Sequence, residues 1–185
     1  MDTLKAIFTR QSVPVVRPDP VPRALVERLL AAAVQAPNHY HVRPWRFVVL
    51  QGPARERLGD VFAEILREKQ PDLPAAALDK ERAKPLRAPL LIVVGVDLAD
   101  DPRVIEQENL CATAAAVENL LLAAHALGLA GMWRTGAPAY DPRVKTFLGF
   151  QDGQPLIGFL YLGFPVEERP AVTRPSYEDH TVWME

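Results

Sequence analysis

Apolar residues recur along the chain in two patterns, one typical of helices and one typical of strands. Stripes at intervals of three and four residues predict helices, and compact apolar runs ended by Gly or Pro predict strands. The predicted helices span Thr3–Thr9, Arg23–Gln35, Ala54–Lys69, Ala75–Ala83, Val104–Leu127 and Pro142–Leu148. The predicted strands span Trp45–Gln51, Pro89–Val96, Leu129–Thr135 and Leu156–Leu162.

The run Pro89–Val96 is continuously apolar and does not alternate with polar residues. This pattern is typical of a strand covered on both faces, so we expect it at the centre of the sheet. Helices alternate with strands and outweigh them, which predicts an α+β or α/β fold with about four or five strands sandwiched by helices. A doubly wound nucleotide-binding fold competes, but no GxGxxG or GxxxxGKS loop follows a predicted strand.

A chain of 185 residues predicts one domain, spanning residues 1–185, because two would each be too small to bury a substantial core. The polar, proline-punctuated segment 70–88 is expected to form a surface excursion or lid. The C-terminal tail, residues 166–185, ends in Val182, Trp183 and Met184, so we expect it to pack against another surface.

Charge, hydropathy and cysteine content together favour a cytoplasmic protein that binds neither nucleic acid nor membranes. Lys and Arg total 21 against 23 Asp and Glu, so no strong positive field attracts polyanions. The apolar run Leu120–Trp133 is shorter than the roughly 20 residues needed to span a bilayer. The lone Cys111 cannot form a disulfide within the chain.

No side-chain set for direct catalysis or metal binding emerges from the sequence. There is no GxSxG turn, and Cys111 lies among alanines in the middle of a predicted helix. The histidines lack the HExxH spacing, which argues against a metal site. Glu106, Glu108 and Glu118 are interpreted as a solvated stripe of one helix.

Three clusters at element boundaries remain as candidates: Arg10-Gln11-Ser12, Pro37 to His41, and Trp133-Arg134-Thr135-Gly136. Arginine beside a hydroxyl residue, as in the first and third clusters, offers forked donors suited to a phosphate dianion. The alternative is that Arg10 caps a helix and Arg134 ends a strand in solvent; residue types alone favour this alternative.

Five segments, in this order, resemble the nitroreductase family, specifically its compact single-domain bacterial NAD(P)H-dependent members. They are Arg10-Gln11-Ser12, Ala36-Pro37 through Phe47, the helix Glu106–Gly128, Trp133 to Gly136, and Gly158 to Gly163. The resemblance extends over almost the full chain. It implies an α+β fold with a central, mostly antiparallel sheet, and a homodimer that holds FMN in its interface.

The resemblance also implies roles for individual residues. Arg10, Gln11 and Ser12 match the family's phosphate and ribityl contacts, and Trp133, Arg134 and Thr135 match its second phosphate-side segment. The two arginines are therefore expected to grip the phosphate from two sides. Residues of the loop that lies on the flavin of the other subunit are matched by Gln35, Pro37, Asn38 and His39. Tyr40 and Arg43 are expected to border the substrate cleft.

The chain departs from the family's pattern in two places. Its common Ser-x-x-Asn-x-Gln-Pro-Trp segment is Asn38 to Trp45 here, with three polar contacts changed, and Gln11 stands where a second arginine is frequent. The implied activity is hydride transfer from NADH or NADPH through FMN to a nitroaromatic, a quinone or a related small electrophile, by a ping-pong mechanism. The flavin carries the hydride, so no catalytic side chain is expected. The alternatives are a flavin- or nucleotide-binding dimer without turnover, and an interaction protein without cofactor.

Overall fold

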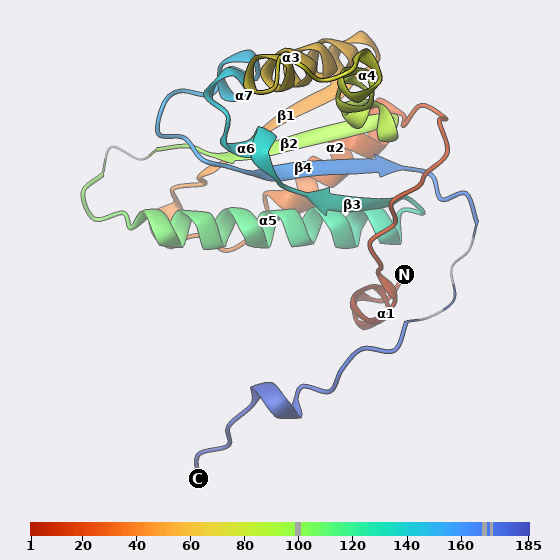
Figure 1. Ribbon diagram of the computed structural model, residues 1–185. Coiled ribbons are helices and arrows are strands. Elements are labelled where there is room, and N and C mark those ends of the chain that lie inside the picture. The colour runs from red at the N-terminus through yellow and green to blue at the C-terminus, as the bar shows by residue number, and fades with distance from the viewer. Residues whose placement is uncertain (99–100, 168–169, 171) are drawn as a thin grey trace.

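Four antiparallel strands form the sheet at the centre of the molecule (Figure 1). The computed structural model describes residues 1–98, 101–167, 170 and 172–185. Within these residues the strands are β1 (Trp45–Gln51), β2 (Leu90–Val96), β3 (Ala130–Arg134) and β4 (Leu156–Gly163), in the spatial order β1-β2-β4-β3. Every neighbouring pair is antiparallel, which confirms the predicted α+β fold.

The strand β2 lies between β1 and β4, and all of its residues are buried. Leu90, Ile92 and Val94 point to one face of the sheet, and Leu91 and Val93 point to the other. Because alternate residues of a strand face opposite sides, a strand between two helix layers needs an unbroken apolar run. The prediction that this strand is central is confirmed.

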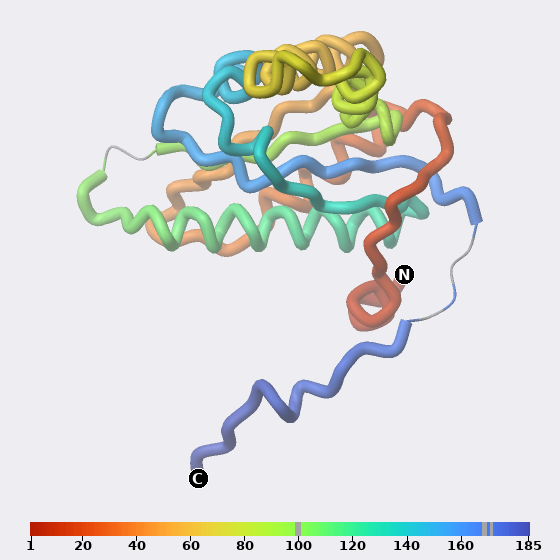
Figure 2. Tube along the Cα trace, in the orientation of Figure 1, coloured from red at the N-terminus to blue at the C-terminus, as the bar shows by residue number. Residues whose placement is uncertain are grey.

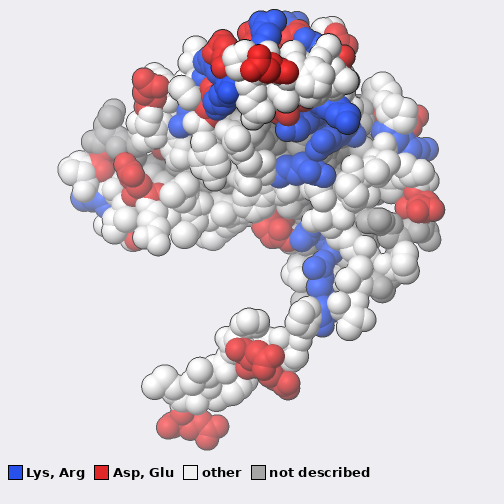
Figure 3. Space-filling model, in the orientation of Figure 1, with Lys and Arg blue, Asp and Glu red and all other residues white. Residues whose placement is uncertain are grey.

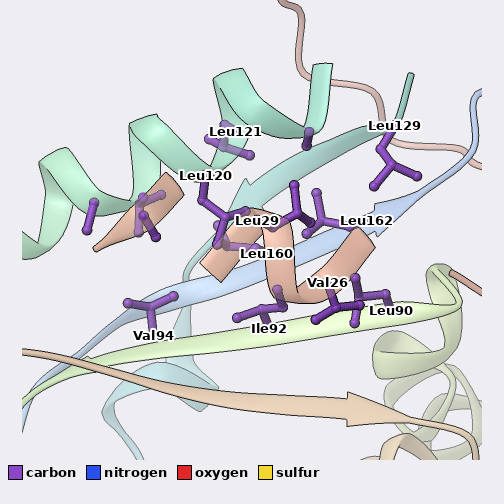
Figure 4. Packing of buried hydrophobic residues seen from close by; sticks show 14 of the residues in the cluster. Val26, Leu29, Leu90, Ile92, Val94, Leu120, Leu121, Leu129, Leu160 and Leu162 are labelled. Carbon is purple, nitrogen blue, oxygen red and sulfur yellow. The ribbon is translucent and has the colours of Figure 1, made fainter. Parts of the chain in front are cut away.

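Helices cover both faces of the sheet (Figures 1 and 2). One face, called the α5 face here, carries α2 (Arg23–Ala33) and α5 (Glu106–Ala126). Figure 4 shows Leu29 of α2 and Leu120 of α5 packed over Leu160 and Ile92 on this face. The other face, called the α3 face, carries α3 (Pro53–Lys69), α6 (Ala137–Tyr140) and α7 (Pro142–Phe147). The helix α4 (Ala75–Arg82) and the 3₁₀ turn η2 (Lys84–Arg87) lie beside α3.

Local capping explains where the helices begin and end. Asp141 accepts the backbone N–H of Arg143 with Pro142 at the first helical position, so α7 begins where the sequence predicts. Gly128, at φ 78°, follows the end of α5 in the left-handed conformation that glycine adopts at little cost. The helix α2 ends at Ala33, two residues before the predicted Gln35, in turns that lead into Pro37.

The N-terminal helix and the C-terminal tail present apolar side chains to solvent. In α1 (Thr3–Thr9), Leu4, Ile7 and Phe8 are exposed, and Ala6 is the buried residue. The tail extends away from the body of the molecule and contains the 3₁₀ turn η3 (Glu178–His180) (Figures 1 and 2). At its end Trp183 is 78% exposed. The expected packing of the tail's apolar end is therefore not formed within one protomer.

Candidate functional site

A cavity of about 330 Å³, called the basic cavity here, lies on the α3 face. Its wall is apolar, with Phe62 and Ile65 from α3 and Phe159 and Tyr161 from β4. The cationic residues around it are Lys69, Lys84, Arg87 and Arg134. Figure 3 shows Lys and Arg atoms gathered beneath α3 and α4, and a second group near α1. An apolar wall beside cations suits an aromatic ligand that carries negative charge.

Segments far apart in the sequence build the basic cavity. Arg134 is the last residue of β3, and Thr135 and Gly136 connect this strand to α6. Gly136 adopts φ 115°, a conformation that side-chain-bearing residues rarely adopt, so glycine is needed where the chain turns from the strand into the helix. Lys84 and Arg87 come from η2, directly before the central strand.

Two of the four cations are neutralised by carboxylates. Lys84 lies 2.6 Å from Oε1 of Glu81, and Lys69 lies 3.1 Å from Oδ2 of Asp141. Burial alone would raise the pKa of Asp141, but the backbone N–H of Arg143 and the Lys69 ammonium outweigh it, and the pKa lies below its usual value. Within the described residues, Arg87 and Arg134 have no such carboxylate partner, so both remain available to an anion.

The pKa of the Tyr161 phenol depends on its burial and on the cations of this cavity. Burial raises its pKa above the usual value, and the positive charges of Arg87 and Arg134 oppose that rise. Tyr161 therefore remains a neutral hydroxyl at physiological pH. It can donate a hydrogen bond to a ligand that the two arginines attract.

Trp133 covers the end of the sheet beside Arg134. Its Nε1 donates to the carbonyl of Ile157 at 2.9 Å. Gly158 makes this contact possible, because a Cβ at that position would lie 2.2 Å from the Trp133 Nε1 atom. The predicted cluster Trp133-Arg134-Thr135 thus lies together at one corner of the sheet, with Arg134 and Thr135 on the basic cavity.

The cluster Arg10-Gln11-Ser12 lies at the other end of β3. Ser12 forms a parallel bridge with Gly131, and the N–H of Val13 donates to the Gly131 carbonyl at 2.8 Å. Arg10 lies 3.2 Å from Glu118 of α5 and lines a second cavity, of about 420 Å³, between α1 and α5.

The tail crosses this cluster. The side chain of Gln11 donates to the carbonyl of Pro170 at 2.7 Å, and Arg174 donates to the carbonyl of Arg10 at 3.2 Å. A second guanidinium thereby comes to lie beside Arg10.

Arg10 and Arg134 line different cavities, on opposite faces of the sheet. Arg10 shares its cavity with Leu121 and Leu162 of the α5 face, whereas Arg134 shares the basic cavity with residues of the α3 face. Within one protomer the two arginines therefore do not form the expected clamp. The reason is that Arg10 follows α1, which packs beside α5, whereas Arg134 ends β3 beside residues of α3.

The predicted flavin-covering loop lies apart from both arginines. Gln35, Pro37 and His39 are exposed, and Asn38 is half-buried. Together with the start of α5, the stretch Pro37 to His39 lines an open groove. The predicted cleft residues Tyr40 and Arg43 are exposed and both adopt positive φ, 50° and 52°. One chain alone does not bring this loop to the basic cavity.

Four basic residues near these sites were missed by sequence reasoning: Lys69, Lys84, Arg87 and Arg174. The signal for Lys84 and Arg87 was the basic run Lys80 to Arg87 directly before the buried strand. No local pattern indicated Arg174, because its position beside Arg10 depends on the path of the tail.

Within residues 1–98, 101–167, 170 and 172–185, no three His, Cys, Asp or Glu side chains gather as a metal-binding group. No helix in the same ranges is long and apolar enough to cross a membrane.

Comparisons with known proteins agree on one family. The sequence profile described as "Nitroreductase family" matches residues 7–164. The chain is 34% identical over 166 residues to "Putative NAD(P)H nitroreductase YdjA" of Escherichia coli strain K12, covering 89% of each chain. A nitroreductase-like family protein from Bacillus cereus has a similar structure, with a TM-score of 0.83 at 28% identity, and the match covers 100% of this chain and 97% of the other. A nitroreductase with bound FMN from Desulfitobacterium hafniense shares the fold, with a TM-score of 0.70 at 22% identity over 100% of both chains.

Proposed function

Because the chain belongs to the nitroreductase family, we propose that it is an FMN-dependent oxidoreductase that uses NADH or NADPH as reductant. The acceptor we propose is a nitroaromatic, a quinone or a related small electrophile, reduced in a ping-pong cycle. The names of the relatives support the reductant, and a structural neighbour with bound FMN supports the cofactor.

The strand β3 carries the proposal, because it joins the two arginine clusters. Ser12 pairs with Gly131 near its start, and Arg134 is its last residue. Three residue steps of an extended strand span about 10 Å. Because β3 is an edge strand, an elongated molecule with a phosphate at one end and an aromatic ring at the other can pass along its free edge from the Arg10 cavity to the basic cavity.

The residues present fit FMN in this arrangement. We assign the phosphate to Arg10 and Ser12, with Arg174 beside them, because forked guanidinium donors match a phosphate dianion. We assign the ring to the basic cavity, where an apolar wall lies beside Arg87 and Arg134. The flavin ring supplies hydride transfer when bound, and the side chains bind it, orient it and exclude water.

We further propose a homodimer in which the partner completes this site. The exposed apolar residues Leu4, Ile7 and Phe8 of α1, and Trp183 of the tail, lack a covering surface in one protomer. Large exposed apolar side chains of this kind are typical of an interface. The Gln35 to His39 loop would then lie against the partner's cofactor, as the resemblance implies.

The visible spectrum of the purified protein tests the proposal. We expect flavin absorption that anaerobic NADH or NADPH bleaches and that p-benzoquinone restores. A colourless protein that takes up no added FMN would contradict the proposal at the level of the cofactor. Bound flavin that neither nucleotide bleaches would instead support the binding protein without turnover.

A further inference from the structure

We propose that His39 and Glu108 form a pair that delivers the proton needed when the electron acceptor is reduced. The inference rests on the proposed function, and it adds a proton donor to a site for which the sequence predicts no catalytic side chain. His39 is the donor, and Glu108 is the positioning residue.

The pair joins two segments that are distant in the sequence. Nδ1 of His39 lies 2.7 Å from Oε2 of Glu108, the third residue of α5. The solvated stripe predicted for Glu106, Glu108 and Glu118 therefore needs correction at Glu108, because its side chain is engaged and half-buried. The carboxylate accepts a hydrogen bond from the Nδ1–H group and fixes the orientation of the ring.

A stack of side chains supports the imidazole from one side. The ring of Tyr40 lies 4.4 Å from that of His39, and the two planes differ by 6°. The guanidinium of Arg103 lies 5.0 Å from the Tyr40 ring, and Arg103 is itself 2.6 Å from Asp101. The stack restricts His39 although the residue lies on the surface.

The backbone of this loop is strained. Tyr40, His41 and Arg43 adopt φ values of 50°, 56° and 52°, a conformation that side-chain-bearing residues rarely adopt. Oδ1 of Asn38 accepts the N–H of Arg43 at 2.8 Å and helps to hold the loop. Strain that the surrounding contacts maintain is found at functional sites more often than elsewhere.

The free edge of the imidazole is directed away from its anchor. Within the described residues Nε2 of His39 has no hydrogen-bond partner, and the side chain is 58% exposed. The groove beside it is lined by Pro37 and Asn38 and by Ile105 and Cys111 at the start of α5. In the proposed dimer this groove faces the partner's cofactor, so a planar acceptor bound between them meets a nitrogen that is oriented and not otherwise engaged.

The chemistry balances for a quinone. NAD(P)H supplies two electrons and one proton through the cofactor. The second proton leaves Nε2 of protonated His39: the N–H bond breaks, an O–H bond forms on a quinone oxygen, and the product is the hydroquinone. Water then returns a proton to the imidazole. The titratable and charged groups near His39 are Glu108 on α5, Asp101 and Arg103 behind Tyr40, and His41 and Arg43 in its own loop.

Stopped-flow reoxidation of the reduced holoprotein tests the pair in Glu108→Gln, with Glu106→Gln as matched control. Glu106 is exposed in the same first turn, so the control removes the same charge near the same helix end. p-Benzoquinone takes up protons on reduction, whereas ferricyanide accepts an electron alone. We expect Glu108→Gln to slow reoxidation by p-benzoquinone about tenfold or more and to leave reoxidation by ferricyanide unchanged. Glu106→Gln should match the wild type with both acceptors.

A second readout does not depend on turnover. Nitrogen-15 NMR of the His39 ring should place the proton of the neutral imidazole on Nδ1 in the wild type, with that preference lost in Glu108→Gln. Equal slowing with both acceptors would show a structural role and overturn the inference, as would unchanged reoxidation. If the protein binds no flavin, or if NAD(P)H does not reduce its flavin, the result contradicts the proposed function and not the role of this pair.

Discussion

The hydroxyl of Thr9 lies 2.7 Å from Nε2 of His125 and ties α1 to the C-terminal part of α5. Thr9 donates its one proton to the carbonyl of Lys5 at 2.6 Å, so it must accept from His125. Nε2 of His125 therefore carries a proton. Burial lowers the pKa of His125 below its usual value, and the nearby charge of Arg10 lowers it further.

This lowered pKa makes the stability of the fold depend on pH. The neutral imidazole is favoured in the folded state, so its contribution is fully present above the ordinary pKa of 6.5. It is lost as the pH falls from there through the lowered pKa of the folded state. We expect the difference in unfolding free energy between wild type and His125→Gln to shrink as the pH falls. Urea denaturation at a series of pH values measures it; a constant difference would contradict the pKa shift.

Removing Arg10 should weaken FMN binding more than removing His39. The Arg10→Ala change deletes a charge-assisted contact to the phosphate, worth about 1.5 to 3 kcal/mol, or roughly a 10- to 150-fold rise in Kd. Arg174→Ala should have the same direction. Fluorescence titration of each apoprotein with FMN gives the Kd values of the Arg10→Ala, Arg174→Ala and His39→Ala variants. Arg28→Ala, an exposed arginine on α2, is the matched control. Equal flavin retention by Arg10→Ala and wild type would reject the assignment.

Gly158→Ala should displace Trp133 and destabilise the corner of the sheet. The added Cβ would lie 2.2 Å from the Trp133 Nε1 atom and 2.7 Å from the Arg134 carbonyl oxygen. We expect a loss of about 1 to 3 kcal/mol, measured by thermal unfolding together with tryptophan fluorescence. Gly128→Ala separates overlap from backbone strain, because Gly128 also has positive φ but has open space around it. If the two variants lose equal stability, overlap with Trp133 does not matter.

Deleting residues 181–185 should weaken the homodimer. Val182, Trp183 and Met184 are exposed in one protomer, and their burial against a partner would contribute to association. We expect dimer dissociation to become at least about tenfold more favourable, since a buried tryptophan is a common interface anchor. Sedimentation at several protein concentrations measures this, with circular dichroism to check the fold. An unchanged dissociation constant would assign the dimer contacts elsewhere.

Local patterns predicted the elements well because their boundaries have local causes. The strand β2 follows from its unbroken apolar run, and α7 begins at its Asp-Pro cap. The pairing order and the antiparallel directions were not predictable from such patterns, since they depend on contacts between distant segments. The resemblance supplied the antiparallel sheet.

The site was harder to predict for the same physical reason. Arg134 lay in a recognisable cluster, but the cations near it come from η2, about 50 residues earlier in the chain. The positive φ of Tyr40 could not be foreseen, because its stacking with His39 and Arg103 is tertiary. The contact between Glu108 and His39 was missed likewise, since charge periodicity alone cannot tell an engaged carboxylate from a solvated one.

The sheet also separates two hydrophobic cores, one on each of its faces. Leu90, Ile92 and Val94 belong to one core, and Leu91 and Val93 belong to the other, so substitutions on the α3 side change the neighbourhood of the basic cavity without touching the leucines beneath α5. Variation in ligand preference can therefore accumulate on one side while the opposite layer keeps the chain folded.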